Sequence, residues 1–175
     1  ATVLPTATQT AAATATPTAA PTATPVSTPT TLSNPAAPGN YGSPEIRAAY
    51  QIDPLWQQGI TGKNQQVVVT VSYGDPHLQA DFDAYNTYYG LPQQTLDIVA
   101  PLGPTPPPTG DPFNIKEHNS WAVETALDVE MVHAVAPDAQ IIVLTSPVDS
   151  TEGTGGLPQF RQLIQYAMTH YPGAI

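Results

Sequence analysis

The sequence predicts an α/β fold in which a parallel β-sheet is connected by helical crossovers. From residue 66 onward, short segments rich in β-branched residues alternate with longer segments whose apolar residues recur at helical spacing. Strands separated by helices pair in parallel, because each helix carries the chain back to the starting edge of the sheet. The predicted strands are 66–72, 95–99 and 139–145, and the predicted helices are 77–89, about 119–135 and 157–171.

The first 40 residues differ in composition from the rest of the chain. They contain no charged residue and consist mainly of Ala, Thr, Pro and Ser. Such a segment buries too little apolar surface to offset the entropy lost on ordering. We therefore predict a disordered, semi-extended linker over residues 1–40 and a folded domain over residues 41–175. Stalks of this type, some of them O-glycosylated, join exported domains, and a generic tether with no binding role is the favoured interpretation.

Two short helices are predicted at the start of the folded part. Ser43 as an N-cap, followed by Pro and Glu, is a typical helix start. Asp53 begins a further turn that should end at Gly59. Residues 61–64, Thr-Gly-Lys-Asn, form a turn that leads into the first strand.

The first strand is expected to lie inside the sheet. Residues 66–72 form a nearly continuous apolar run, which favours a central strand covered on both faces over an edge strand. The helix at 77–89 carries Leu78, Phe82 and Tyr85 on its apolar stripe. Residues 101–112 follow the second strand and are rich in Pro and Gly, so we expect a surface loop there.

The last third of the folded part continues the alternation. The strand at 139–145 is expected to be buried, and a polar, Gly-rich loop over 146–156 follows it. The inward face of the helix at 157–171 is expected to consist of Phe160, Leu163, Ile164 and Ala167. Residues 173–175 look like the start of another strand. We therefore expect a sheet that is incomplete at the C-terminus, in a fragment of a longer protein.

Charge and composition exclude several classes of function. The chain has 14 acidic and 4 basic residues, a formal net charge of −10 and a pI of about 4.3. Nucleic acids and anionic membranes attract positive surfaces, so neither is an expected partner. No segment contains the run of about 20 apolar residues that a helix needs to cross a bilayer. The composition suits a secreted protein, or one that works in acid, and we expect a monomer.

Cysteine and histidine offer no obvious metal or redox chemistry. The chain has no Cys, which excludes disulfides and thiolate catalysis. The four histidines, at 77, 118, 133 and 170, lack the spacing typical of metal ligands. We predict no metal site within this chain, and we expect His133 to be a hydrogen-bonded histidine of the core or its rim.

Two acidic residues inside the helix at 119–135 are the candidate catalytic groups. Glu124 and Asp128 are four residues apart, so they project from the same face of the helix, one above the other. Apolar residues flank them on nearly every side, which predicts a helix that is buried all round. Two carboxyl groups in such a place are costly unless they share a proton, meet a partner or perform chemistry.

The alternative is that this pair has no catalytic role. Acids at this spacing on an exposed helix face are common and only mildly repulsive. Against this alternative, no Lys or Arg lies between Lys116 and Arg161, so no buried salt bridge is available within the helix. Glu130 points away from the pair and is expected to be structural or ion-paired.

Two loops are candidate walls of a cleft. In an open parallel sheet, ligands bind at the carboxyl ends of the strands, which favours the loops that start at Tyr73 and Ser146. A plain strand-ending turn explains Tyr73 and Asp75 equally well. Glycines 153, 155 and 156 are not followed by Lys-Ser/Thr, so a phosphate-binding loop is not expected. The sequence assigns no substrate-binding residue.

Three stretches of the chain resemble the sedolisin family, the serine-carboxyl peptidases, whose fold is subtilisin-like. They are residues 47–63, residues 67–92 with Tyr-Gly-Asp-Pro and Tyr-Gly-Leu-Pro, and residues 124–137 with Glu-Thr-Ala-Leu-Asp-Val-Glu and His-Ala-Val-Ala-Pro. The third stretch is the most specific. The resemblance implies that residues 41–175 are the amino-terminal portion of a peptidase catalytic domain.

The resemblance also implies a serine-type endopeptidase that cleaves proteins or peptides at acidic pH. In this family the first acid of the Glu-x-x-x-Asp motif is the general base for a serine nucleophile, and the Asp orients it. These roles would fall to Glu124 and Asp128. A carboxylate coupled to a second carboxylate stays partly ionised in acid, where a histidine base is protonated.

Parts of the family's machinery have no counterpart in this chain. The nucleophile lies in a downstream Gly-Thr-Ser motif, and the oxyanion-hole Asp and a Ca²⁺ site are expected beyond Ile175. The piece alone is therefore expected to be inactive. Many relatives have an acid at the end of the first strand, where this chain has Val71 and Ser72. Relatives also usually carry an inhibitory prodomain, whereas the linker precedes the domain here.

A non-catalytic secreted domain, adhesive or binding, is the alternative function. Such a domain would retain the peptidase-like fold without the chemistry, and Val71 in place of an acid favours it. The presence or absence of a serine motif downstream would separate the two functions.

Overall fold

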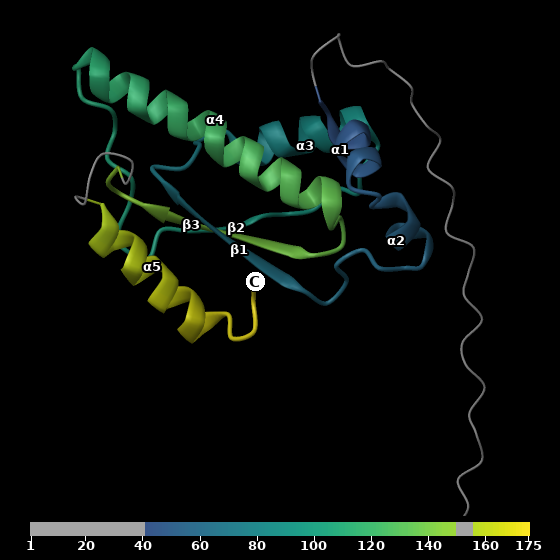
Figure 1. The fold of residues 1–175 in the computed structure, drawn as a ribbon. Coiled ribbons are helices and arrows are strands. Elements are labelled where there is room, and N and C mark those ends of the chain that lie inside the picture. Colours follow the sequence, from purple (N-terminus) through teal and green to yellow (C-terminus); the bar gives the residue numbers. More distant parts are fainter. Residues whose placement is uncertain (1–40, 150–155) are drawn as a thin grey trace, which may run out of the picture.

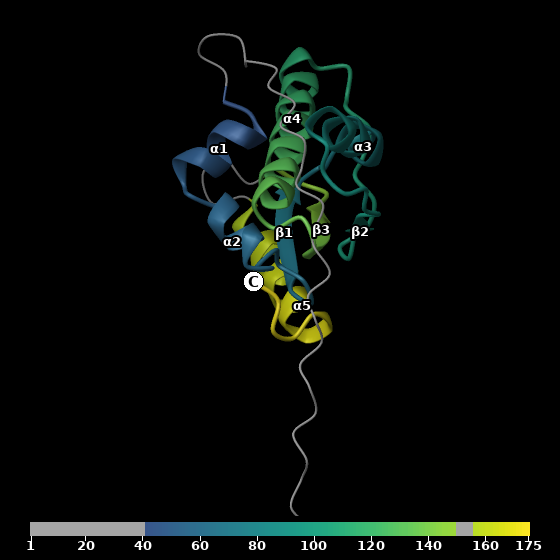
Figure 2. The same cartoon turned by 90° about the vertical axis from the view of Figure 1, so that its right-hand side faces the viewer.

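The computed structural model describes residues 41–149 and 156–175, which form an α/β unit (Figure 1). Its elements are α1 (Ser43–Ala49), α2 (Asp53–Gln57), β1 (Gln66–Ser72), α3 (Leu78–Tyr89), β2 (Asp97–Val99), α4 (Pro112–Val135), β3 (Gln140–Ser146) and α5 (Leu157–His170). Helices α3 and α4 cover one face of the sheet, with α1 beside α4, and α5 covers the other face (Figures 1 and 2). The predicted parallel sheet with helical crossovers is confirmed. None of the described helices is long and apolar enough to span a membrane.

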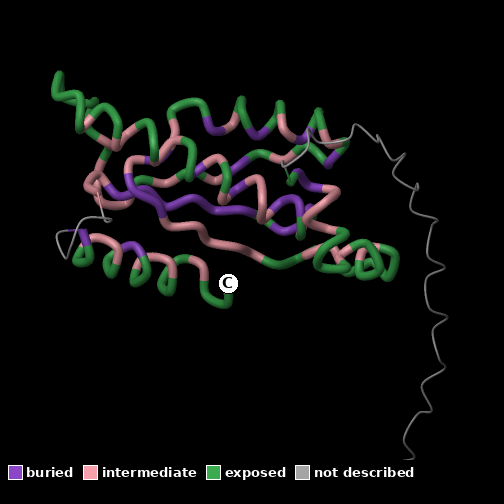
Figure 3. Tube along the Cα trace, turned by 45° about the horizontal axis from the view of Figure 1, so that its top comes forward, coloured by how far each residue is buried: buried purple, intermediate pink, exposed green. Residues whose placement is uncertain are grey.

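Strand β3 is the centre of the sheet. The order is β1-β3-β2, with both neighbours parallel to β3, and Val143 of β3 lies opposite Val69 on one side and Ile98 on the other. All residues of β3 after the first are buried (Figure 3). The predicted central position of β1 is therefore wrong for the described sheet. Its faces are covered, but it has a full strand partner on one side only, and five of its seven residues are half-buried.

The sheet buries an apolar core on each face. Ile141 and Val143 face α3 and α4, whereas Ile142 and Leu144 face α5. Side chains of a strand point alternately to opposite faces, so a strand covered on both sides favours apolar residues at successive positions. This preference explains the apolar run from Ile141 to Leu144 in β3.

Helix α5 presents a different inward face from the predicted one. Leu163 is fully buried and packs with Tyr166 and Ala167, at helical spacings of three and four residues. Because this stripe faces the sheet, Ile164 lies on the outer side of α5 and is 52% exposed. The predicted inward position of Ile164 is therefore wrong. Phe160 is half-buried.

The crossovers through α3 and α4 have opposite hands. The first leads from β1 past β3 to β2, and the second leads back from β2 to β3. Both helices nevertheless cover the same face of the sheet. Two crossovers that run in opposite directions over one face cannot both be right-handed, although about 98% of such units are. This topology places the long helix α4 across the middle of the sheet.

The last residue of the chain pairs with β1. Ile175 donates its N–H to the Gln66 carbonyl at 3.0 Å, and its carbonyl accepts the Val68 N–H at 2.9 Å. Bonds to residues on either side of one partner position are typical of a parallel ladder. The contact agrees with the expectation that residues 173–175 lead into a strand.

Helix α4 begins seven residues earlier than predicted. Asp111 is its N-cap, and the Asp111 side chain accepts the Phe113 N–H at 3.2 Å, while Pro112 occupies the first turn. Asp at the N-cap followed by Pro at the first helical position is a strong helix start. The Pro-rich composition of residues 101–112 obscures this signal in the sequence, so Pro112 was predicted as part of the preceding loop.

The cap of α1 also differs from the prediction. Gly42, rather than Ser43, is the N-cap, and its N–H donates to the Glu45 carboxylate at 2.9 Å. Ser43 lies in the first turn and is buried. Its hydroxyl is therefore available to a different partner, Arg47.

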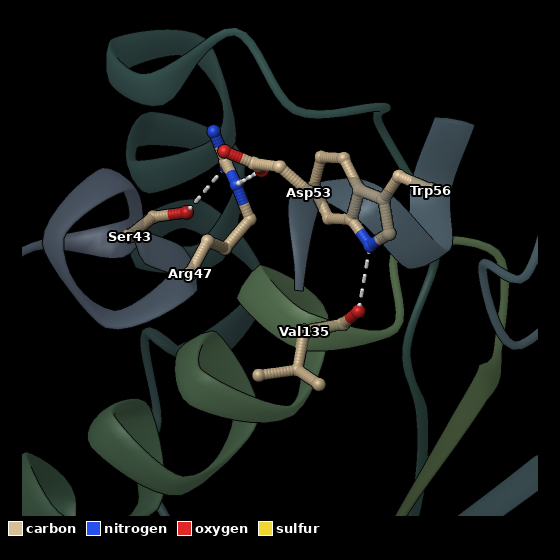
Figure 4. A network of polar contacts seen from close by, with 5 residues as sticks. All are labelled: Ser43, Arg47, Asp53, Trp56 and Val135. Atoms are coloured by element: carbon tan, nitrogen blue, oxygen red, sulfur yellow. Dashed lines mark hydrogen bonds and ion pairs between the residues drawn. The ribbon is translucent and has the colours of Figure 1, made fainter. Parts of the chain in front are cut away.

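A polar clamp joins α1 and α2 to the C-terminal end of α4 (Figure 4). Arg47 donates from Nε to Asp53 Oδ1 at 2.8 Å and from Nη1 to Ser43 Oγ at 3.0 Å. Its guanidinium lies 4.4 Å from the centre of the Trp56 ring. The Trp56 indole N–H in turn donates to the carbonyl of Val135, the last residue of α4, at 2.9 Å.

We expect Trp56→Ala to lower the free energy of unfolding by about 2–3 kcal/mol, and Trp56→Phe by only about 1 kcal/mol. Phe keeps an aromatic ring against Arg47 but lacks the N–H that bonds the Val135 carbonyl. Urea denaturation followed by circular dichroism measures both values. Equal losses in the two variants, or no loss in either, would contradict the clamp.

Candidate active site

Helix α4 carries both predicted catalytic acids. Glu124 and Asp128 lie one turn apart near its middle. The Glu124 side chain is exposed and that of Asp128 is half-buried. Burial raises the pKa of Asp128, and the neighbouring negative charge of Glu124 raises it further. The structure therefore brings the two carboxyl groups within electrostatic reach of each other.

The expectation that this helix is buried all round is wrong. Val123 is 71% exposed and Leu127 is 47% exposed, both next to Glu124. The buried residues of α4 are Thr125, Val129, His133 and Ala134. A helix lying on one sheet is covered only where it meets the sheet and its neighbouring helices. The opposite face of α4 stays open despite its apolar residues, and it is this face that holds Glu124.

A hollow of about 470 Å³ lies beside α4 and includes Glu124. This volume is in the range of ligand sites. Its lining residues are Phe113, Lys116, Glu117, Ser120, Trp121, Glu124 and Asp149. A larger hollow of about 570 Å³, nearer the start of α4, contains neither Glu124 nor Asp128, so the chemistry favours the smaller one.

Asp149 is a site residue that the sequence analysis missed. It follows β3 in the loop that starts at Ser146, and that loop was predicted as a wall of the cleft. Its Oδ1 accepts the Trp121 indole N–H at 2.9 Å. The available signal was its place just after a buried strand, where ligands bind in parallel sheets. A single Asp without a spacing motif did not stand out.

The other predicted wall, at Tyr73, lies at the same edge of the sheet. The Tyr73 N–H donates to the Ser146 carbonyl at 2.8 Å, and its ring stacks on His118 of α4 with centroids 3.9 Å apart. Asp75 has a local role, because its carboxylate accepts the His77 N–H at 2.8 Å. A strand-ending turn therefore accounts for the presence of Asp75, whereas Tyr73 also contacts helix α4.

His133 is a core residue, as predicted. It is fully buried, its Nε2 is 2.8 Å from the Pro92 carbonyl, and its ring meets Phe82 edge-on at 4.8 Å. Burial lowers the pKa of His133, while the Pro92 carbonyl and the more distant Asp138 act in the opposite direction. These contacts place it toward α3, away from the hollow.

Glu130 also lies away from the hollow, but it has no ion pair within residues 41–149 and 156–175. Burial, followed by the charge of Asp81 on α3, raises the pKa of Glu130 to about 7. The ion-paired alternative for this residue is therefore not supported.

No cluster of three or more potential metal ligands occurs in the described part of the chain. The Ca²⁺ ion implied by the family resemblance was expected beyond Ile175. Gly153 and Gly155, together with the predicted linker 1–40, lie outside the described residues.

Comparison with known proteins gives one informative similarity. No protein-family profile matches the chain, and no solved structure matches it significantly. Kumamolisin from Bacillus sp. (strain MN-32), a sedolisin, is 30% identical over 115 residues, which is 66% of this chain. The chain is distantly similar to a sedolisin peptidase. It spans 19% of the length of kumamolisin. The similarity to kumamolisin agrees with the resemblance drawn from the Glu124–Asp128 motif.

Proposed function

We propose that this chain belongs to an acid-acting serine endopeptidase of the serine-carboxyl kind, in which Glu124 is the general base and Asp128 its partner. The main observation is the coupled acid pair, one helical turn apart, with Glu124 in a hollow at the carboxyl edge of the sheet. Similarity to kumamolisin supports the same function.

The proposed chemistry requires an alcohol from outside the described residues. The serine oxygen would attack the peptide carbonyl carbon while its proton passes to the Glu124 carboxylate. Collapse of the tetrahedral intermediate breaks the C–N bond, and Glu124 returns the proton to the leaving amine. Water then hydrolyses the acyl-enzyme by the same proton route.

Asp128 suits the role of partner. Its raised pKa keeps it protonated over a wider pH range than an ordinary Asp, so it can donate a hydrogen bond to an ionised Glu124. One shared proton leaves a single negative charge on the pair. Such a pair can accept the serine proton under conditions in which a histidine base is already protonated.

The open face of α4 provides a place for the missing nucleophile. Val123 and Leu127 are exposed on either side of Glu124 along the helix. A further segment that covers these apolar residues would bring its own side chains next to the Glu124 carboxylate. We propose that the nucleophilic serine lies on such a segment, outside residues 41–175. We also propose that the protein is secreted and monomeric and that its substrate is a protein or peptide. A Ca²⁺ ion would be held by the part of the protein outside residues 41–175.

The longer parent protein provides the direct test. It is expected to cleave a denatured protein between about pH 3 and 5 and to lose activity towards neutral pH. The present chain alone is expected to be inactive. Ser120 lines the hollow next to Glu124, so Ser120→Ala is the matched control, and it should leave activity unchanged if the nucleophile lies elsewhere. A parent protein with no activity at any pH would reject the proposal.

A non-catalytic binding domain is the second candidate. Its supporting observation is Val71, fully buried at the position where many sedolisins have an acid, beside a buried Ser72. This domain would lack a Gly-Thr-Ser motif downstream and would show no hydrolysis in the same assay.

A further inference from the structure

A long-range hydrogen bond connects the turn of α4 before Glu124 to the end of β3. The Trp121 indole N–H donates to Asp149 Oδ1 at 2.9 Å, across 28 residues of sequence. The Trp121 ring also packs against the core between α4 and the sheet. The indole is therefore held on one side by apolar packing and on the other by the Asp149 carboxylate. Glu124 lies three residues further along α4 and borders the same hollow.

Tyr73 connects the same region to the end of β1. Its backbone is in the left-handed region, with φ of 57°, which is uncommon for a residue with a bulky side chain. Strain of this kind persists only where the surroundings require it. The surroundings here are the stacked ring of His118 and the N–H bond to the Ser146 carbonyl. Burial raises the pKa of Tyr73, and a hydrogen bond with the Asp149 backbone partly offsets this rise.

We propose that Asp149 is a positioning residue for Glu124, acting through Trp121. The inference rests on the proposed function. Asp149 and Tyr73 follow two neighbouring strands and contact α4 within the two turns before Glu124. They thereby set the position of Glu124 relative to the strand ends, where a substrate is expected to bind. A displacement of about 1 Å at a reacting group costs on the order of 100-fold in rate.

The hydrogen bond can be tested in the present chain without any activity. The chain has two Trp residues, so Trp56→Phe and Trp121→Phe assign both indole N–H resonances in an NMR spectrum. We expect Asp149→Ala to shift the Trp121 indole resonance and accelerate its hydrogen exchange at least about tenfold, while the Trp56 resonance stays in place. Asp149→Asn keeps a side-chain carbonyl acceptor and should preserve most of the protection. An unchanged Trp121 resonance in Asp149→Ala would overturn the inference.

The positioning role is tested in the parent peptidase. We expect Asp149→Ala and Trp121→Phe to lower kcat about 10- to 100-fold with KM within about threefold, and Asp149→Asn to retain most of the activity. Trp56→Phe is the matched control, because it removes an indole hydrogen bond at the other end of the same helix. It should cost stability without lowering kcat.

The outcomes separate this inference from the proposed function. If Glu124→Gln abolishes activity while Asp149→Ala and Trp121→Phe behave like Trp56→Phe, the positioning role is wrong and the peptidase proposal stands. If Glu124→Gln leaves full activity, the peptidase proposal fails, and the positioning role fails with it.

Discussion

In the proposed parent peptidase, Glu124→Gln is expected to lower kcat by about 100- to 10,000-fold at acidic pH, the usual contribution of a general base. Gln has nearly the same size and polarity as Glu, but it cannot accept the serine proton. Because the Glu124 side chain is exposed, the substitution should leave the fold intact. Hydrolysis of a denatured protein measures the rate, and circular dichroism checks the fold.

Asp128→Ala tests the second member of the pair. Removing the partner carboxyl is expected to lower kcat by about 10- to 100-fold, a smaller loss than for the base itself. Asp83→Asn on α3 is a suitable control, because this exposed acid accepts a bond from Gln79 that an amide can also accept. Full activity of Glu124→Gln, or an equal loss in the Asp83 control, would contradict the assigned roles.

Glu130→Gln is expected to raise the free energy of unfolding by about 2 kcal/mol near pH 8 and to leave it nearly unchanged near pH 4. Burial raises the pKa of Glu130 from 4.5 to about 7, and Asp81 adds to the effect. The magnitude allows for solvent screening of a half-buried group. An uncharged Gln removes the cost of holding an ionised carboxylate in this position.

The pH dependence follows from the direction of this shift. A carboxyl whose pKa is higher in the folded protein than in the unfolded chain binds protons preferentially when folded. Its contribution to stability is complete below about pH 4.5 and is lost as the pH rises through about 7. Asp128, whose pKa is also raised, acts in the same direction. We therefore expect these two groups to make the protein more stable in acid, which suits the proposed function.

The surroundings of Glu130 explain why no cation among residues 41–149 and 156–175 offsets its charge. Helices α3 and α4 meet where the Phe82 ring contacts the His133 ring, and Glu130 lies about one turn before His133 on α4. The neighbours of Phe82 on α3, Asp81 and Tyr85, lie close enough to Glu130 to interact with its charge. The charge of Glu130 contributes to raising the pKa of Tyr85, after burial. On α1, Arg47 is already engaged by Asp53, Ser43 and Trp56.

Urea denaturation at both pH values measures the effect. Asp81→Asn should also raise the free energy of unfolding at pH 8, but by less than Glu130→Gln does. It removes only one of the two causes that raise the pKa of Glu130, the charge of Asp81. Glu124→Gln is the matched control on the same helix and should change the difference between pH 4 and pH 8 only slightly. A wild-type protein equally stable at both pH values, together with no gain from Glu130→Gln, would show that this carboxyl does not control stability.

Local features of the sequence were sufficient to predict most of the elements. The strands at 66–72 and 139–145 agree with β1 and β3 to within one residue. In the predicted apolar stripe, Leu78 and Phe82 are buried and Tyr85 is half-buried. The spacing of Glu124 and Asp128 places them one turn apart in any α-helix, whatever surrounds it. These features depend on residues a few positions apart, so they can be inferred from the order of amino acids.

Only the tertiary structure decided which surfaces are covered. The apolar runs of β1 and β3 look alike in sequence, yet β3 is central because both other described strands pair with it. Val123 and Val129 are equally apolar, yet one is exposed and the other buried, since the sheet lies on one side of α4. Trp121 meets Asp149 only because the crossover returns the chain to the centre of the sheet. Such contacts join residues that are distant in sequence, and no local pattern encodes where two distant segments will pack.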